Sequence, residues 1–258
     1  MSGAAQQMPE AIRAENLVKV FGKITALAGV SLRVERGETL GILGDNGAGK
    51  STLIKILTGY HQPDRGQVFV DGRAVALASV DDARALGIEC VYQDLALVNG
   101  LSIYHNMFLN RELLWGGPLR FLNHSAMRRR AAEALAEIGV DVPSVELEVG
   151  ALSGGQRQAI AVARAVYSQA RILLLDEPLA AMGAREARLI IELIERLRSR
   201  GDIAIVMIAH NYAQTLEICD RVILMQHGEI TFESSTAATS AEELLEIVRR
   251  EYRAVRTG

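Results

Sequence analysis

The sequence predicts an α/β protein with a mainly parallel core sheet, an antiparallel β subdomain at its N-terminal side and an inserted helical subdomain. Three observations carry this prediction. Short, strand-like apolar runs dominate the first 93 residues, and helical periodicity replaces them between residues 94 and 169. After residue 170, continuous apolar strands alternate with amphipathic helices, as in parallel sheets that are covered on both faces. We therefore expect a core made of residues 1–93 and 170–258, with residues 94–169 inserted as the helical subdomain.

The first part reads as strands at residues 30–34, 39–43, 68–70 and 88–92. Asp71-Gly72 is a strong hairpin turn pair after the third of these strands. A helix is expected over residues 50–57, because apolar residues recur at helical spacing before Gly59. Ser79, followed three residues later by Asp82, predicts a second, short helix that closes at Gly87.

The remaining elements follow from the same signals. A helix is expected after Ser125, ending at Gly139, and residues 143–152 are expected to form a loop. Trp115-Gly116-Gly117-Pro118 is expected to break the segment before that helix. The C-terminal part predicts strands at 172–175, 203–208 and 222–225 and helices at 185–197, from Tyr212, and at 241–253.

Composition excludes several classes of protein. The 28 Lys and Arg against 31 Asp and Glu give a net charge of −3, which argues against a dedicated nucleic-acid binder. Cys90 and Cys219 lie far apart and show no metal-binding spacing. The chain contains no apolar run of about 18 residues, and its first residues lack the apolar centre of a signal peptide. We expect a cytoplasmic protein.

A phosphate-binding loop is predicted between the strand at 39–43 and the helix at 50–57. The pattern G-x-x-x-x-G-K-[ST] is matched in full by Gly44, Asp45, Asn46, Gly47, Ala48, Gly49, Lys50, Ser51 and Thr52. Glycines let the backbone N–H groups and the helix N-terminus surround phosphate oxygens. Lys50 is expected to reach the β and γ phosphates of ATP, and the Ser51 hydroxyl to ligate Mg²⁺.

Two acids follow the apolar strand at 172–175. Asp176 and Glu177 are expected at the carboxyl edge of the parallel sheet, where ligands bind. Asp176 is a candidate Mg²⁺ ligand, and Glu177 is the candidate that polarises the attacking water. The alternative is that both acids only cap the turn before Pro178.

The segment Leu152-Ser153-Gly154-Gly155-Gln156-Arg157-Gln158 resembles the signature of the ATP-binding cassette (ABC) ATPases, because LSGGQ precedes an apolar strand that ends in Asp-Glu. This resemblance implies the ABC form of the P-loop NTPase fold. Ser153, Gly154, Gly155 and Gln156 would then form a second anion site at a helix start, facing the γ phosphate held by another subunit.

Three further positions are assigned by the resemblance. Gln93 matches the glutamine that touches Mg²⁺ and the attacking water, and His210 matches the histidine that contacts the γ phosphate. Phe21 matches the aromatic residue that stacks on adenine. For Gln93 the alternative is a polar loop residue, for His210 a structural histidine, and for Phe21 a core residue.

The chain departs from many cassettes at Gly183, where an aspartate usually helps couple the two sites. Together with the segments at 57–64 and 106–109, this form resembles the cassettes of ribose, xylose and fructose importers. The resemblance implies two copies that sandwich two Mg-ATP molecules head to tail and drive a separate membrane permease. An extracytoplasmic binding protein would deliver the sugar, and the chain would lie on the inner face of the membrane.

Other functions stay open at this stage. A soluble cassette ATPase acting on ribosomes or DNA is the main alternative, and a regulatory module that holds ATP without turnover is another. Arg128, Arg129 and Arg130 are expected to form a solvated helix face rather than a nucleic-acid site. Trp115 is expected to be a packing anchor, with contact to a partner protein as the alternative.

Overall fold

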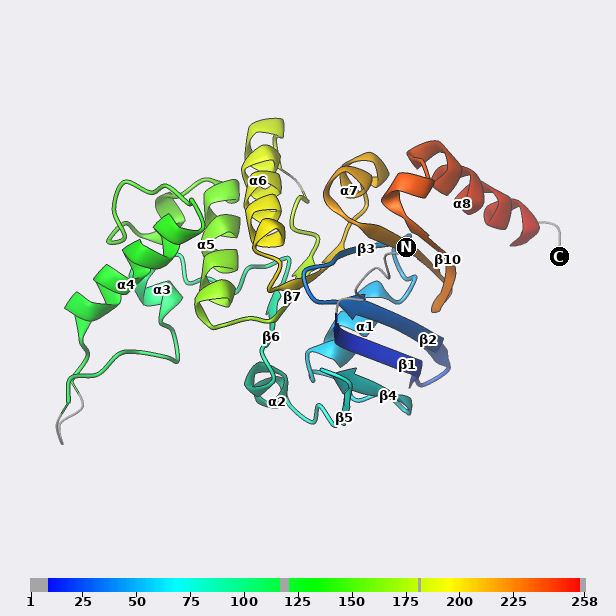
Figure 1. Ribbon diagram of the computed structural model, residues 1–258, viewed down its shortest axis with the longest axis horizontal. Helices are drawn as coiled ribbons and strands as arrows, with labels where there is room; N and C mark the ends of the chain where they lie inside the picture. Colours follow the sequence, from blue (N-terminus) through cyan, green and yellow to red (C-terminus); the bar gives the residue numbers. More distant parts are fainter. Residues whose placement is uncertain (1–8, 117–120, 181, 256–258) are drawn as a thin grey trace, which may run out of the picture.

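A six-stranded sheet forms the centre of the fold. The computed structural model describes residues 9–116, 121–180 and 182–255, with side chains up to residue 250. The strands lie in the order β10-β9-β3-β8-β7-β6 (Figure 1). All neighbouring pairs are parallel except β9 and β10. The bounds are β3 Thr39–Leu43, β6 Ile88–Val91, β7 Ile172–Asp176, β8 Ala204–Ile208, β9 Arg221–Gln226 and β10 Glu229–Ser235.

A second, four-stranded sheet is antiparallel and has the order β2-β1-β4-β5. Its strands are β1 Glu10–Phe21, β2 Ile24–Glu35, β4 Arg65–Val70 and β5 Arg73–Val75. The predicted Asp71-Gly72 turn is confirmed, since it joins β4 to β5 with both residues at positive φ, 50° and 72°. The two sheets confirm the predicted α/β fold class.

The sequence prediction included only part of β2 and did not include β1, β5 or β10. The strand expected at 30–34 is only part of β2, which pairs with β1 across the turn at Gly22. Strand β10 was not predicted at all, although Ile230 and Phe232 alternate with polar residues after the turn at His227-Gly228. This edge strand is half-exposed, and its sequence pattern of apolar residues is therefore weaker than that of the buried strands.

Six of the eight helices in the described residues confirm predicted ones, whereas α3 was not predicted and α5 was predicted only as a helix start. They are α1 Lys50–Leu57, α2 Val80–Ala85, α3 Ile103–Met107, α4 His124–Glu137, α5 Gly154–Tyr167, α6 Ala184–Arg200, α7 Tyr212–Ile218 and α8 Ala241–Val255, with short 3-10 turns at Val149–Ala151 and Thr236–Ala238. Helix α4 starts earlier than expected because Asn123, not Ser125, caps it by accepting a hydrogen bond from the Ala126 N–H. Gly117 and Pro118 of the predicted break lie outside the described residues.

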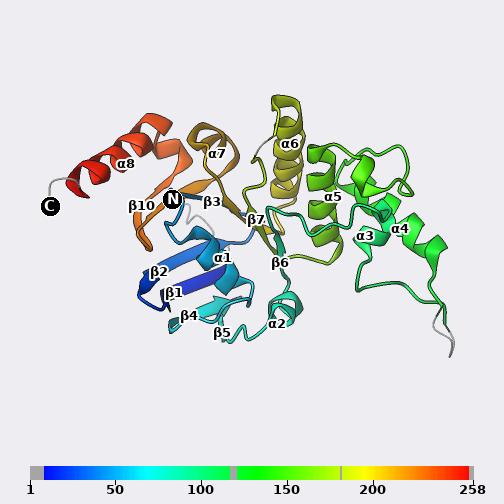
Figure 2. The same ribbon diagram turned by 180° about the vertical axis from the view of Figure 1, so that it is seen from behind.

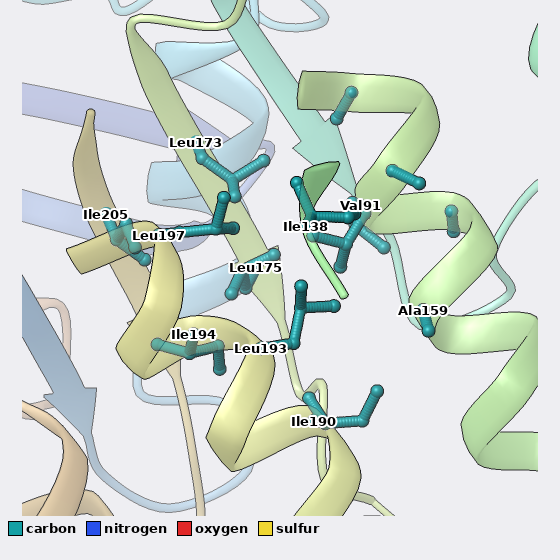
Figure 3. Packing of buried hydrophobic residues seen from close by; sticks show 14 of the residues in the cluster. Val91, Ile138, Ala159, Leu173, Leu175, Ile190, Leu193, Ile194, Leu197 and Ile205 are labelled. Carbon is teal, nitrogen blue, oxygen red and sulfur yellow. The ribbon is translucent and has the colours of Figure 1, made fainter. Parts of the chain in front are cut away.

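Helices cover both faces of the central sheet, as the apolar strands predicted. Along β7, Leu173 and Leu175 belong to one buried cluster, while Ile172 and Leu174 belong to the cluster on the opposite face. Figure 3 shows Leu173 and Leu175 facing side chains of α6 such as Leu193. On the other face, α1 and the antiparallel sheet supply the partners. Helices α3, α4 and α5 gather at one end of the molecule, beyond α6 (Figures 1 and 2).

Within the described part of the chain, no helix is both long and apolar enough to cross a bilayer.

Asn106 holds the long segment between β6 and α3 together. Its side chain is fully buried, and Oδ1 accepts a hydrogen bond from the Val98 N–H at 2.8 Å. Nδ2 lies 3.0 Å from the Val98 carbonyl oxygen and 3.1 Å from that of Leu101. Its Oδ1 thus pairs a backbone N–H that has no other hydrogen-bond partner among the described residues, and its Nδ2 adds a hydrogen bond to carbonyl oxygens that already accept backbone N–H groups.

Replacing Asn106 by Ala should therefore be costly. The substitution leaves the Val98 N–H without its partner and removes the second hydrogen bond to the Val98 and Leu101 carbonyl oxygens, and we expect a loss of about 1–3 kcal/mol in the free energy of unfolding, measured by urea denaturation. Asn99→Ala, at an exposed position of the same loop, is the matched control and should change stability by less than about 0.5 kcal/mol. Equal stability of the two variants would contradict this role for Asn106.

Candidate functional site

The loop that follows β3 leaves the middle of the central sheet and leads directly into α1. Three of its glycines have positive φ, namely Gly44 at 142°, Gly47 at 83° and Gly49 at 102°. A Cβ atom on Gly44 would lie 2.2 Å from the Met225 carbonyl oxygen, and one on Gly49 would lie 2.5 Å from that of Ala26. Conformation and close packing thus both require glycine. The loop curls in front of the N-terminus of α1, the arrangement that binds phosphate.

Lys50 is the first residue of α1, and its side chain is only 5% exposed. Its Nζ donates to the carbonyl oxygens of Gly44, at 2.6 Å, and Asp45, at 2.9 Å. Burial lowers the pKa of Lys50, against the opposing effect of the charges on Glu177, Asp45 and Asp176. The ammonium group is therefore poorly hydrated and lies close to the carboxylates.

Asp176 and Glu177 lie at the carboxyl end of β7, as predicted. Burial raises the pKa of Asp176, and the neighbouring Glu177 charge raises it further. Glu177 has φ of 53°, a left-handed conformation that is uncommon for a non-glycine residue and is typical of functional sites. Among the described residues, no backbone N–H donates to either carboxylate, so the structure gives no support to a capping role.

His210 meets Glu177 across the ends of adjacent strands. Its Nε2 lies 2.6 Å from Glu177 Oε1, which places the two side chains in direct hydrogen-bond contact. Asn211 then caps α7 by accepting from the Gln214 N–H. The sequence analysis did not single out Asn211, although a residue of this type just before a helical run is an N-cap signal.

A cavity of about 440 Å³ borders this pair. It lies between residues 177–187 and 208–215, and Glu177, Pro178, Met182 and His210 contribute to its wall. Residues 44–52 do not line it. The Glu177 carboxylate and the His210 imidazole therefore border open space and remain accessible to a polar ligand, and Glu177 also lies close enough to Lys50 to affect its pKa.

Gln93 follows β6, the neighbour of β7, and so lies at the same edge of the sheet. It is exposed, and among the described residues no hydrogen bond joins it to Lys50 or the acids. The turn after it is tied to α5, because Arg164 donates to the carbonyl oxygens of Leu95, at 3.0 Å, and Ala96, at 2.9 Å. The sequence analysis missed Arg164, although an arginine inside the apolar run at 159–166 is an available signal.

Ser153 caps α5, so the predicted helix start is present. Its hydroxyl accepts from the Gln156 N–H at 3.3 Å, and Gln156 Oε1 accepts from the Ser153 N–H at 3.1 Å. Gly155 packs against Glu186 of α6, where a Cβ would lie 3.0 Å from the Glu186 Cβ. Helix α5 lies well apart from α1 (Figure 1), so one chain does not bring Ser153 to its own phosphate loop.

Phe21 ends β1 and is 42% exposed, which excludes the core alternative. Its ring makes an edge contact with His61 at a centroid distance of 5.2 Å. The Lys19 ammonium lies 5.4 Å from the centroid of the same ring, and the exposed part of the ring is accessible to a planar ligand.

Comparison with known proteins places this geometry in a family. A family model described as ABC transporter matches residues 27–180. The chain is 44% identical to a xylose/arabinose import ATP-binding protein of Sulfolobus acidocaldarius, over 93% of the chain and 94% of that protein. It is 41% identical to a fructose import ATP-binding protein of Rhizobium meliloti, over 84% of the chain and 85% of that protein.

Solved structures agree with these matches. The ADP conformation of an ATP-binding cassette of an ABC transporter superposes with a TM-score of 0.78 at 26% identity, covering 93% of this chain and 95% of that one. A cassette dimer in a post-hydrolysis state with ADP and phosphate gives a TM-score of 0.73 at 26% identity, covering 87% of this chain and 98% of that one. The resemblance noted in the sequence is confirmed: the chain belongs to the ABC transporter family.

Proposed function

We propose that this chain is the ATP-hydrolysing subunit of an ABC transporter that energises sugar import through a separate membrane permease. The observation that carries the proposal is the hydrogen bond between His210 and Glu177 at the edge of the sheet where the phosphate loop begins. Relatives named for xylose/arabinose and fructose import support the substrate class. No relative that we compared supports action on ribosomes or DNA.

Binding of ATP follows from the loop and α1. The N–H groups of the loop and of the first turn of α1 would surround the phosphates, and Lys50 would neutralise the β and γ phosphates. Exposed Phe21 would stack on adenine. Because stacking depends little on base identity, this contact supplies affinity rather than selectivity.

The residues present suit Mg²⁺. Ser51 is exposed in the first turn of α1, and the Asp176 carboxylate lies close enough to Lys50 to affect its pKa. Mg²⁺ on phosphate oxygens needs only one or two protein oxygen ligands, so Ser51 and Asp176, with Gln93 from the adjacent strand end, are sufficient. When bound, the ion would draw negative charge from the phosphate oxygens during transfer.

Hydrolysis would then depend on Glu177 and His210. Glu177 accepts a hydrogen bond from the attacking water, orients it toward the γ phosphorus and receives its proton as the new P–O bond forms. The bond from the γ phosphorus to the bridging oxygen breaks, leaving ADP and phosphate. Lys50 and His210 stabilise charge on the transferring group.

A complete site would need two copies. Ser153, Gly154, Gly155 and Gln156 lie on α5, away from the chain's own loop, and would face the ATP held by a second copy. A related cassette is a dimer in its post-hydrolysis state, which supports this arrangement. In this proposal residues 94–169 form the helical subdomain, and the permease holds the dimer on the cytoplasmic face of the membrane. A sugar-binding protein outside the cell delivers the substrate.

Lys50→Ala and Glu177→Gln should impair ATP binding and ATP hydrolysis to different extents. The first removes the charge that binds phosphate, so both ATP affinity and turnover fall. The second keeps the side chain's size but loses the carboxylate that orients water, so ATP still binds while hydrolysis drops by about 10²- to 10⁴-fold. Nucleotide titration and phosphate release measure the two effects separately. Glu192→Gln, on the exposed face of α6, is the control, and native turnover by Glu177→Gln would refute the assigned base.

Asp176→Asn should stabilise the nucleotide-free protein at neutral pH. Burial and Glu177 raise the pKa of Asp176, so its ionised form disfavours the folded state. The gain in the free energy of unfolding over the native protein should be fully present above that raised pKa. It should disappear as the pH falls toward the ordinary aspartate pKa of about 3.9. Urea unfolding at several pH values measures this effect.

The same substitution should weaken the stabilisation of the protein by Mg-ATP, measured as a shift in the melting temperature. Asp94→Asn, at an exposed turn, is the control for both measurements. A destabilised Asp176→Asn protein at neutral pH would show that Asp176 has a structural role instead.

Mixing two inactive variants should restore activity if the copies share sites. Lys50→Ala and Ser153→Arg subunits each form dimers with two damaged sites, whereas a mixed dimer has one site with both defects and one with neither. Phosphate release by the mixture should therefore exceed that of either variant alone, and native turnover should rise with protein concentration. No rescue, together with turnover independent of concentration, would mean that one copy suffices.

A further inference from the structure

A two-stranded projection between α3 and α4 plays no part in the ATP site. We call it the arm, defined as residues 109–116 together with 121–123. Leu114 and Leu122 form an antiparallel bridge, the Trp115 N–H donates to the Phe121 carbonyl oxygen at 2.8 Å, and the Asn123 N–H donates to that of Leu113. The arm extends beyond α3 and α4 at the end of the molecule opposite α8 (Figures 1 and 2).

The described part of the arm carries apolar side chains that pack against little of the protein. Trp115 is 58% exposed and Phe121 is 65% exposed. The expectation that Trp115 is a packing anchor is therefore wrong. Three leucines, at positions 109, 114 and 122, are also exposed on the same short segment. Large apolar side chains gathered on one projection are typical of an interaction surface.

The charge around the arm differs from that of the whole chain. Residues 109–132 contain five arginines and one acid, Glu112, whereas the chain as a whole carries a net charge of −3. This part of the sequence is therefore strongly basic within an acidic protein, and it favours an anionic partner.

Part of this basic charge is exposed in the middle of α4. Arg111 pairs with Glu89 at 2.7 Å and Arg128 with Glu146 at 2.6 Å, whereas Arg129 lies 3.7 Å from Glu133 in an exposed pair. Arg130 is exposed and makes no ion pair with any described residue. Arg129 and Arg130 thus retain charge that the protein itself does little to neutralise.

Aromatic and aliphatic side chains on a projection that leads into an arginine-rich helix suit the headgroup region of a bilayer. Tryptophan places its apolar ring and its N–H in that region, and arginine pairs with lipid phosphates. A second copy of this chain would cover apolar side chains but would bring together two basic segments. We propose that the arm binds an anionic lipid surface, with Trp115 and Phe121 inserted among the headgroups and Arg129 and Arg130 against the phosphates. This inference does not depend on the proposed ATP-driven transport.

Trp115 is the only tryptophan of the chain and therefore reports on the arm directly. The full-length protein is mixed with vesicles of phosphatidylcholine alone or of phosphatidylcholine with phosphatidylglycerol. We expect the protein to float with the anionic vesicles, the Trp115 emission to shift to shorter wavelength, and lipids brominated near the headgroup to quench it. High salt should weaken binding.

Variants test each half of the proposal. Phe121→Ser keeps the reporter and should weaken partition into anionic vesicles by on the order of 10-fold, because a large apolar side chain no longer enters the interface. Arg129→Gln with Arg130→Gln should weaken it by roughly 10- to 30-fold, since one arginine near an anionic surface contributes about fivefold. The matched controls are Ile24→Ser, 70% exposed on the antiparallel sheet, and Arg249→Gln with Arg250→Gln on α8. Thermal unfolding verifies that every variant is folded.

Other results would overturn the proposal. These are no binding to anionic vesicles, equal binding to neutral ones, or an equal loss in the control variants. If Trp115 emission instead shifts with protein concentration in the absence of lipid, and Phe121→Ser abolishes self-association in sedimentation, the arm is an interface between copies of the chain.

Discussion

The register of three parallel strands is the constraint on which the site depends. Ile42 of β3, Ile208 of β8 and Asp176 of β7 are partners across the sheet, so the three strands end at the same level. The ladder continues for one more step, since the Glu177 N–H donates to the Ile208 carbonyl oxygen and the Ala209 N–H to that of Ile42. The phosphate loop, the acids and His210 therefore emerge side by side. A shift of one residue in any strand would turn its side chains to the opposite face and separate these groups.

Packing supports this alignment from both faces. Because β3, β7 and β8 are buried on each side, apolar side chains fill both clusters and leave the strands little freedom to move. The loop itself is held by β2 and by the turn before β10, where Ala26 and Gly228 approach its glycines closely. The antiparallel sheet and the edge strand thus act as supports for the phosphate loop.

Buried charges at the site lower the free energy of unfolding of the ligand-free protein. Lys50 and Asp176 both have pKa values shifted by burial toward their neutral forms, which means that the fold holds each charge at a cost. The phosphates of ATP and a magnesium ion would supply the opposite charges. In the proposed function, binding energy at this site would therefore be gained by relieving unfavourable burial as well as by forming hydrogen bonds. Arg164 of α5 and Asn106 of α3 fasten the segment after Gln93 to these two helices.

Local patterns in the sequence were sufficient to predict the α/β fold class, the phosphate loop and the two acids after β7, whereas Phe21, Gln93 and His210 were assigned by the resemblance to the ABC ATPases. The glycine loop, the acids after an apolar strand and the LSGGQ segment each depend on turn chemistry, side-chain period or a helix start, and these are short-range properties. The strand order, the contact between His210 and Glu177, and the role of Asn106 depend on residues far apart in the chain, which local periodicity does not encode. Strand β10 escaped prediction because an exposed edge strand tolerates polar residues. The exposure of Trp115 was likewise decided only by the tertiary structure, since burial depends on which other segments pack against a side chain.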